Sequence, residues 1–151
     1  MSSLVGIAIR AGARAPMEPL SRCVVSRDAG LAGDSRGRPG KRQVTVLSET
    51  AWLRACAELG RPLPWTVRRA NLLVRGLEFG PDDMGRLLRI GALTLEVCGE
   101  TDPCRRMDEA CPGLRAALEP EWRGGVCCRV VAGGVITLAD PAAWVPDLFR
   151  P

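Results

Sequence analysis

The stretch of the sequence most suited to chemistry is Thr-Asp-Pro-Cys-Arg-Arg over residues 101–106. Asp102 is a good helix N-cap, and Pro103 is a preferred residue at the first position of a helix. This pattern predicts that Cys104 lies in the first helical turn, where free N–H groups and the helix dipole favour an anion. The two arginines that follow add positive charge and favour the thiolate. Cys104 is therefore predicted to be an activated cysteine, substantially ionised near neutral pH, and the candidate nucleophile of the chain.

The other cysteines point to simpler roles. The chain has seven cysteines and no histidine, so Cys–His and Ser–His pairs and zinc sites with imidazole ligands are excluded. Free cysteines most often pack as small buried hydrophobes, and Cys23 and Cys56 fit that description. The spacings of Cys98, Cys104 and Cys111 do not match the paired knuckles of structural zinc. A zinc or iron–sulfur site is not expected.

A glycine-rich basic loop over residues 26–43 is a candidate anion site. The glycines of residues 30–42 expose backbone N–H groups, and counter-charge comes from three arginines and a lysine: Arg36, Arg38, Arg42 and Lys41. Both features suit phosphate. The loop matches neither a Walker motif nor a dinucleotide fingerprint. An exposed basic loop without a ligand is the alternative interpretation.

Two further stretches could contact a ligand. Arg68-Arg69-Ala70-Asn71 leads into a predicted strand, and Arg69 and Asn71 could bind an anionic or amide-bearing group. Arg123 precedes Gly124 and Gly125, which would let a ligand approach the backbone closely.

Length and composition indicate one domain over residues 1–151. The chain is 46% hydrophobic and 25% charged, with a net charge of +4 and Lys41 as its only lysine. Two phenylalanines, no tyrosine and no basic run argue against a nucleic-acid platform. No apolar run reaches the roughly 20 residues of a membrane span, and the N-terminus does not resemble a signal peptide. The scattered cysteines then favour a reduced, cytoplasmic protein with no membrane partner.

The elements that must position these residues are mostly short strands. A helix should begin after the N-cap Ser48 and end at Gly60. Residues 103–118 look helical with a break at Pro112-Gly113, and residues 141–149 look like a short helix. Strands are predicted over 3–9, 22–26, 43–47 and 71–75, on both sides of Gly91, and as a hairpin of 125–131 with 135–138. This order predicts a mainly β fold with inserted helices, forming a closed or nearly closed β-barrel.

An ordered set of short motifs resembles the MOSC family, named for the C-terminal domain of molybdenum cofactor sulfurase. No single motif is specific, but together they run from about residue 30 to residue 140, and the chain looks like a short stand-alone member. The matching stretches are Gly33-Asp34, Arg42-Gln43-Val44, Arg69-Ala70-Asn71-Leu72, Leu88-Arg89-Ile90-Gly91, Pro103-Cys104-Arg105-Arg106-Met107, Gly124-Gly125-Val126, Arg129-Val130 and Gly133-Gly134-Val135.

The resemblance implies a barrel-like β fold and a special role for Cys104. In the family, the matching cysteine is proposed to carry sulfur as a persulfide, a role independent of pyridoxal phosphate. In relatives such as the mitochondrial amidoxime-reducing component, it ligates molybdenum in a pterin cofactor (molybdopterin), and thiolate suits such a metal. Arg69 matches an arginine that helps to bind that cofactor. Arg123 stands where many relatives have histidine.

The resulting functional hypothesis is a molybdenum-cofactor-binding or sulfur-carrier protein. Cys104 would be the metal ligand or persulfide carrier, with Arg36, Arg38, Arg69, Asn71 and Arg123 holding the cofactor. Relatives imply reduction of N-hydroxylated substrates, with a cysteine-desulfurase-type sulfur donor or an electron-donor protein as partner. The alternatives are a non-catalytic binding or delivery module without bound metal, and a barrel that keeps only an interaction role. Substrate and oligomeric state stay open.

Overall fold

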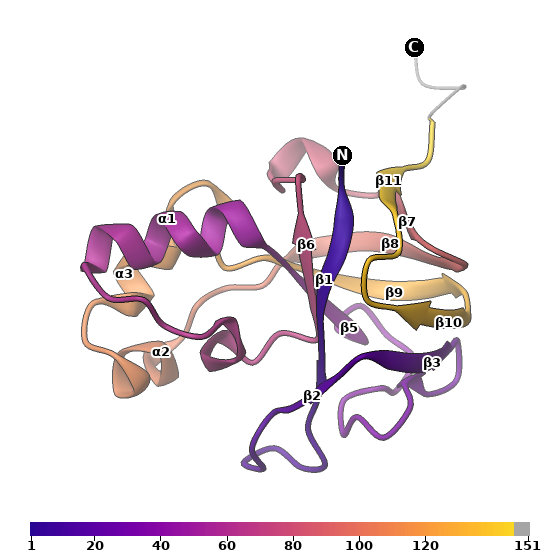
Figure 1. Cartoon of the computed structure of the whole chain (residues 1–151), viewed down its shortest axis with the longest axis horizontal. Coiled ribbons are helices and arrows are strands. Elements are labelled where there is room, and N and C mark those ends of the chain that lie inside the picture. The colour runs from indigo at the N-terminus through magenta and orange to yellow at the C-terminus, as the bar shows by residue number, and fades with distance from the viewer. Residues whose placement is uncertain (147–151) are drawn as a thin grey trace.

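The fold is mainly β, with its helices gathered at one side (Figure 1). The computed structural model describes residues 1–146. Its strands are β1 (Ser3–Ile9), β2 (Glu18–Leu20), β3 (Arg22–Ser26), β4 (Gly30–Leu31), β5 (Val44–Ser48), β6 (Leu72–Arg75), β7 (Leu87–Ile90), β8 (Leu93–Glu100), β9 (Val126–Ala132), β10 (Gly134–Thr137) and β11 (Ala142–Trp144). Its α-helices are α1 (Glu49–Leu59), α2 (Arg105–Ala110) and α3 (Leu114–Leu118). Short 3₁₀ helices span Trp65–Arg68, Pro81–Asp83 and Pro120–Trp122.

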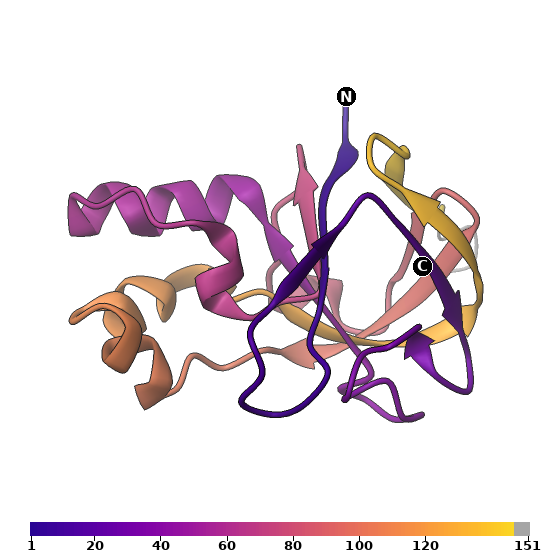
Figure 2. The same cartoon turned by 60° about the horizontal axis from the view of Figure 1, so that its bottom comes forward.

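The described residues form two sheets. The larger has eight strands in the order β11-β7-β8-β9-β5-β6-β1-β2, and the smaller has the order β10-β3-β4. All pairs are antiparallel except β5 with β6, which are parallel and joined through α1. The strands curve around a common interior (Figure 2).

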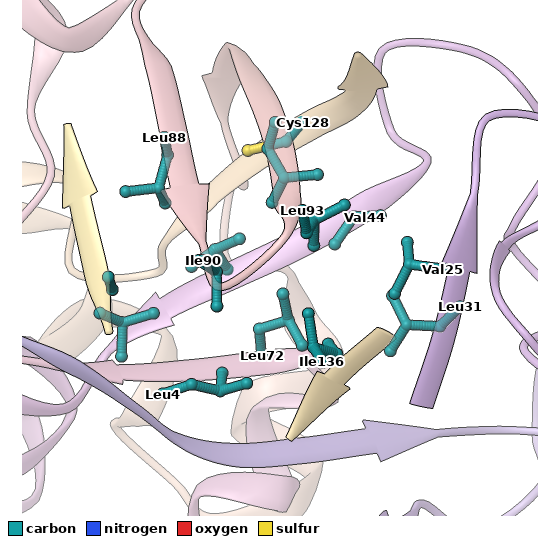
Figure 3. Packing of buried hydrophobic residues seen from close by; sticks show 14 of the residues in the cluster. Leu4, Val25, Leu31, Val44, Leu72, Leu88, Ile90, Leu93, Cys128 and Ile136 are labelled. Carbon is teal, nitrogen blue, oxygen red and sulfur yellow. The ribbon is translucent and has the colours of Figure 1, made fainter. Parts of the chain in front are cut away.

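That interior is filled by one face of each strand. In β8, Leu93, Leu95 and Val97 are buried, while Glu96 and Cys98 on the other face are partly exposed, as the alternation predicts. Leucines, valines and isoleucines from both sheets meet in this core, as the labelled side chains of Figure 3 show.

The helices cover a second apolar cluster. Ser48 caps α1 by accepting a hydrogen bond from Ala51 N, and Gly60 ends the helix in the left-handed region at φ 67°. Trp52 and Cys56 are buried and Leu59 is partly buried, so the predicted helix and its apolar stripe are confirmed. The cluster also includes residues of α2 and α3, which anchors the segment containing Cys104.

The predicted hairpin of residues 125–131 with 135–138 is wrong. Both edges of β9 are already paired, with β5 and with β8, so β10 cannot fold back onto it. Instead β10 pairs with β3. At the turn, a Cβ on Gly133 would lie 2.5 Å from the Val25 carbonyl oxygen of β3, which explains the glycine.

Two other predictions, the helix over residues 141–149 and the closed or nearly closed barrel, are also not confirmed by the structure. The predicted helix over 141–149 is wrong where the chain is described, because Ala142–Trp144 completes the edge of the sheet beside β7, while 147–149 lie outside the described residues. Closure into a barrel is not confirmed. Strands β11 and β2 remain the edges of the larger sheet, and an isolated bridge between Ser3 and Pro141 joins β1 to the segment before β11.

Within residues 1–146, the structure contains no helix that is both long enough and apolar enough to cross a membrane.

Candidate functional site

Cys104 lies at the start of α2 with its thiol exposed. The prediction that Asp102 caps this helix is wrong. Cys104 itself is the N-cap residue, with extended backbone angles (φ −116°, ψ 176°), and its carbonyl accepts the first helical bond from Met107 N at 2.9 Å. Helical geometry therefore begins only at Arg105, one residue after the thiol. Each of the other six cysteines is buried or partly buried.

The thiol lies on the wall of a cavity of about 430 Å³, a size in the range of small-molecule sites. Segments far apart in the sequence supply its walls: the end of β1, the loop before β5, the segment between Arg68 and Asn71, the start of α2, and the approach to β9. The lining residues are Arg10, Asp34, Arg36, Arg42, Thr45, Arg68, Arg69, Ala70, Asn71, Thr101, Asp102, Pro103, Cys104, Arg106, Met107, Arg115, Gly124 and Cys127.

Positive charge dominates this lining, which holds seven arginines and two aspartates. Of these arginines only Arg115 has a carboxylate within 4.0 Å in the described part of the chain, a long contact of 3.9 Å with Glu119. Buried charges are normally paired. A cavity whose cations mostly lack carboxylate partners is suited to binding an anion.

Arg10, directly after β1, is a buried cavity cation that lies near other arginines. It is 7% exposed. Burial lowers the pKa of its guanidinium, and the charges of Arg36 and Arg69 lower that pKa further. Asp34 opposes these effects, and also accepts bonds from the backbone N–H groups of Arg10 (3.0 Å) and Arg36 (3.3 Å). One carboxylate thus positions the backbone of two cavity arginines.

Arg69 has a backbone conformation that is rare for a residue with a side chain, φ 64°. Its Nη2 donates to the carbonyls of Ala13 (3.3 Å) and Ala15 (2.6 Å), which fixes the guanidinium. Its Nε is buried and has no hydrogen-bond partner in the described structure. A donor held in this state at a cavity wall is available to a ligand.

Arg68 supports the cysteine segment from behind. Its buried guanidinium donates to the carbonyls of Gly124 (Nε, 2.9 Å) and Thr101 (Nη2, 2.8 Å). Burial lowers the pKa of Arg68, whereas its electrostatic interactions with the Cys104 segment, including Asp102, raise it. Gly124 must be small here, because a Cβ would lie 2.7 Å from the Thr101 carbonyl oxygen. Arg68 therefore joins the Cys104 segment to the approach to β9.

Asn71 lines the cavity, but its amide is occupied by the protein. Its Oδ1 accepts from Thr45 N (3.0 Å) and Thr45 Oγ1 (3.2 Å), and its Nδ2 donates to the Ala8 carbonyl (3.2 Å). The side chain thus joins β1 to β5 at the start of β6. Its main contribution is to hold the wall in place.

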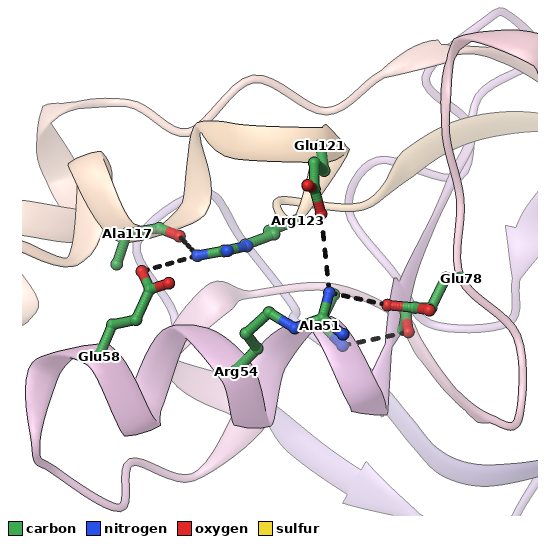
Figure 4. Close-up of polar contacts among 8 residues, drawn as sticks. Ala51, Arg54, Glu58, Glu78, Ala117, Glu121 and Arg123 are labelled. Atoms are coloured by element: carbon green, nitrogen blue, oxygen red, sulfur yellow. Dashed lines mark hydrogen bonds and ion pairs between the residues drawn. The ribbon is translucent and has the colours of Figure 1, made fainter.

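The remaining predicted site residues, Arg36, Arg38 and Arg123, lie in different parts of the structure. Arg36 lines the cavity, whereas Arg38 lines an adjacent hollow. Arg123 lies outside both. It is buried between α1 and α3, where Nη1 donates to Glu58 (2.7 Å) and to the Ala117 carbonyl (3.1 Å), as Figure 4 shows. The structure therefore brings Cys104, Arg36, Arg69 and Asn71 together and separates Arg38 and Arg123 from them.

Sequence reasoning missed Arg10 and Cys127 as cavity residues, whereas Arg42 belongs to the basic loop that it selected. Cys127 is buried on β9, and burial raises its pKa while Arg42 opposes the shift. No local pattern marks Arg10 or Cys127. The one available clue was the position of Arg10, a charge that directly follows a buried strand.

Metal binding by protein ligands alone has no support in the part of the chain that the structure describes, since it contains no group of three or more cysteine, aspartate or glutamate side chains placed to hold an ion. Any metal at Cys104 would depend on further ligands from a cofactor.

A mainly β domain with one exposed thiol on the wall of an arginine-lined cavity is the class of protein that the fold and site define. The family model of the MOSC domain matches residues 28–143. The chain belongs to the MOSC family, a family of domains related to the molybdenum cofactor.

Solved structures share the fold over nearly the whole chain. The YuaD protein of Bacillus subtilis is 20% identical with a TM-score of 0.74, and the match covers 94% of each chain. YiiM of Geobacillus stearothermophilus is 18% identical with a TM-score of 0.76, covering 97% of this chain and 76% of that one. YiiM of Escherichia coli is 16% identical with a TM-score of 0.73, covering 99% and 72%. No curated protein matches the sequence.

Proposed function

We propose that this protein binds a molybdenum–pterin cofactor in the arginine-lined cavity, with the sulfur of Cys104 as a metal ligand. The observation that carries the proposal is the position of the one exposed thiol on the wall of a cavity whose arginines mostly lack carboxylate partners. A phosphate-bearing cofactor needs cations, and a soft metal centre accepts a thiolate.

The lining residues fit such a group. Two buried polar atoms on the wall, Arg69 Nε and Thr101 Oγ1, have no hydrogen-bond partner within the described residues. Buried polar groups are normally satisfied, so these two are available for a polar ligand. Arg10, Arg36 and Arg69 would bind the phosphate, while Arg68 holds the Cys104 segment in place.

When bound, such a cofactor supplies two-electron redox chemistry suited to reducing N-hydroxylated compounds. The residues of the chain bind and orient it. Arg106, next to the thiol and on the cavity wall, favours a negatively charged ligand beside Cys104. An electron-donor protein would be the required partner.

Sulfur carriage is the second candidate function, and the exposure of Cys104 favours it. The Cys104 thiolate would attack the outer sulfur of a persulfide on a cysteine-desulfurase-type donor. A new S–S bond forms at Cys104, and the donor cysteine leaves as a thiolate. A delivery module that binds the cofactor without turnover would use the same residues, and would differ in having no reductase activity.

The test is molybdenum and pterin content of protein made in a host that synthesises the cofactor. Molybdenum near one atom per chain that is lost in Cys104→Ser, but kept in the matched control Cys98→Ser, supports ligation by Cys104. Cys98 is a partly exposed thiol outside the cavity. If the native protein contains neither pterin nor metal, and Cys104 carries the added mass of one sulfur atom, the result would contradict cofactor binding and support sulfur carriage.

A further inference from the structure

A second hollow lies directly beside the cavity of Cys104. It has a volume of about 640 Å³ and is lined by residues 35, 36 and 38–43. Arg36 and Arg42 line both spaces, so the two are contiguous. The hollow adds Arg38 and Lys41, and none of the described residues that line it is acidic. A ligand that fills the cavity and extends past Arg36 would therefore meet further positive charge.

The loop that carries these cations is held firmly at both ends. At one end, Asp34 accepts the backbone N–H groups of Arg10 and Arg36. At the other end, the buried amide of Gln43 donates to the carbonyls of Arg27 (2.8 Å) and Gly37 (3.0 Å) and accepts from Val130 N (2.9 Å). A site fixed before binding loses less conformational entropy when its ligand arrives.

The loop also packs tightly at its centre. A Cβ on Gly37 would lie 1.6 Å from the Ala29 carbonyl oxygen, so the backbone passes in direct contact with the segment before β4. This contact leaves Arg36 and Arg38 on either side of a fixed point. Arg36 lines both the cavity and the outer hollow, whereas Arg38 lines the outer hollow.

The charges of the two spaces match a ligand with two linked phosphates. Arg10, Arg36 and Arg69 already repel one another, since each of the other two lowers the pKa of Arg10. One phosphate among them leaves the outer cations without a partner. A second phosphate, bonded to the first, would lie next to Arg36 and Arg42 and within reach of Arg38 and Lys41.

We propose that the outer hollow binds the second phosphate of a diphosphate ligand whose first phosphate occupies the Arg10–Arg36–Arg69 subsite. This inference rests on the proposed function only in assigning the inner subsite to a cofactor phosphate. The shared chemistry is a diphosphate, which either a nucleotide-extended pterin cofactor or a free nucleoside diphosphate would supply.

The test compares inorganic phosphate with pyrophosphate by calorimetric titration at fixed ionic strength. The native protein should bind pyrophosphate at least about tenfold more tightly than phosphate, because two more charge-assisted contacts form. The double variant Arg38→Ala/Lys41→Ala should lose most of this preference and keep its phosphate Kd within about twofold. The matched control Arg22→Ala/Arg89→Ala removes two exposed cations from β3 and β7 and should behave like the native protein.

Equal affinity of the native protein for the two anions would overturn the proposal. The proposal would also be overturned if Arg38→Ala/Lys41→Ala kept the preference for pyrophosphate over phosphate, or if Arg22→Ala/Arg89→Ala lost it. Cys104→Ser should keep the preference for pyrophosphate over phosphate, because Cys104 is not part of the phosphate subsites. The diphosphate site can therefore be tested separately from metal binding by Cys104. Pterin released together with a nucleotide would identify an extended cofactor as the source, whereas ADP binding in pterin-free protein would identify a nucleoside diphosphate.

Discussion

At the scale of single residues, the role proposed for Arg10 in binding an anion opposes its effect on the stability of the fold. A buried guanidinium surrounded by other arginines destabilises the ligand-free fold, and the same arrangement attracts an anion. Packing alone does not explain a buried cation at this position, and the proposed anion site does.

Replacing Arg10 should separate these two effects. Arg10→Met should raise the Tm of the ligand-free protein, because a hydrophobic side chain relieves the repulsion, and should weaken phosphate binding about 10- to 100-fold through loss of a charge-assisted contact. Thermal unfolding and calorimetric titration measure both. Arg14→Met, an exposed position outside the cavity, is the control. An unchanged phosphate Kd in Arg10→Met would exclude Arg10 from the anion site.

Glu100, two residues before Asp102, gives the stability of the fold a dependence on pH. Burial, and next the Asp102 carboxyl, raise the pKa of Glu100 in the folded protein, while Arg68 opposes them. A raised carboxyl pKa contributes stability that is present at acidic pH and is lost as the pH rises through the folded-state pKa. Glu100→Gln should therefore resemble the native protein near pH 4 and exceed its free energy of unfolding near about pH 7. Urea unfolding at both pH values checks this, with Glu109→Gln as control. If Glu100→Gln has a lower free energy of unfolding than the native protein at neutral pH, the raised pKa assigned to Glu100 is contradicted.

At the scale of elements, Asn71 was predicted to contact a ligand, but its side chain connects strands instead. Its residue type and position before a strand suggested binding, but only the fold reveals that Thr45 and Ala8 already occupy its amide. Asn71→Ala should lower the free energy of unfolding by about 2–4 kcal/mol, because backbone groups of β1 and β5 lose their partners. Denaturant unfolding measures this. A stable variant with abolished phosphate binding would instead restore the ligand role.

The loop before β5 makes a second prediction at this scale. Gly37→Ala should displace the loop, because its Cβ would collide with the Ala29 carbonyl, and should weaken phosphate binding through Arg36. Gly80→Ala, where a Cβ meets nothing within 4 Å, should change neither stability nor affinity appreciably. If Gly37→Ala binds phosphate normally, the rigidity of this loop is irrelevant to the site.

Local elements were the most predictable part of the fold. The bounds of β1, β3 and α1 follow from alternation and capping, which are encoded within a few residues. The partner of β10 was not predictable, because it depends on which edges of β9 remain open after distant strands have paired. The start of α2 differed from the prediction by two residues, a typical uncertainty at a helix end.

At the scale of the whole molecule, the site is a product of topology. Cys104, Arg36 and Arg69 could be selected from residue type, local charge and family resemblance. Arg10 and Cys127 enter only because the sheets bring the end of β1 and the start of β9 to the same cavity. The same topology buries Arg123 between α1 and α3, where it forms an ion pair with Glu58. Convergence of distant segments therefore limits what the sequence alone can assign.

The most direct test of the central claim is X-ray absorption at the molybdenum edge, comparing native protein with Cys104→Ser loaded in excess cofactor, each spectrum normalised to the metal that the protein holds. Ligation by Cys104 predicts one sulfur neighbour more in the native spectrum than in the variant, where an oxygen replaces it. Identical spectra, with the same number of sulfur neighbours, would contradict the claim and show that the metal is held without Cys104.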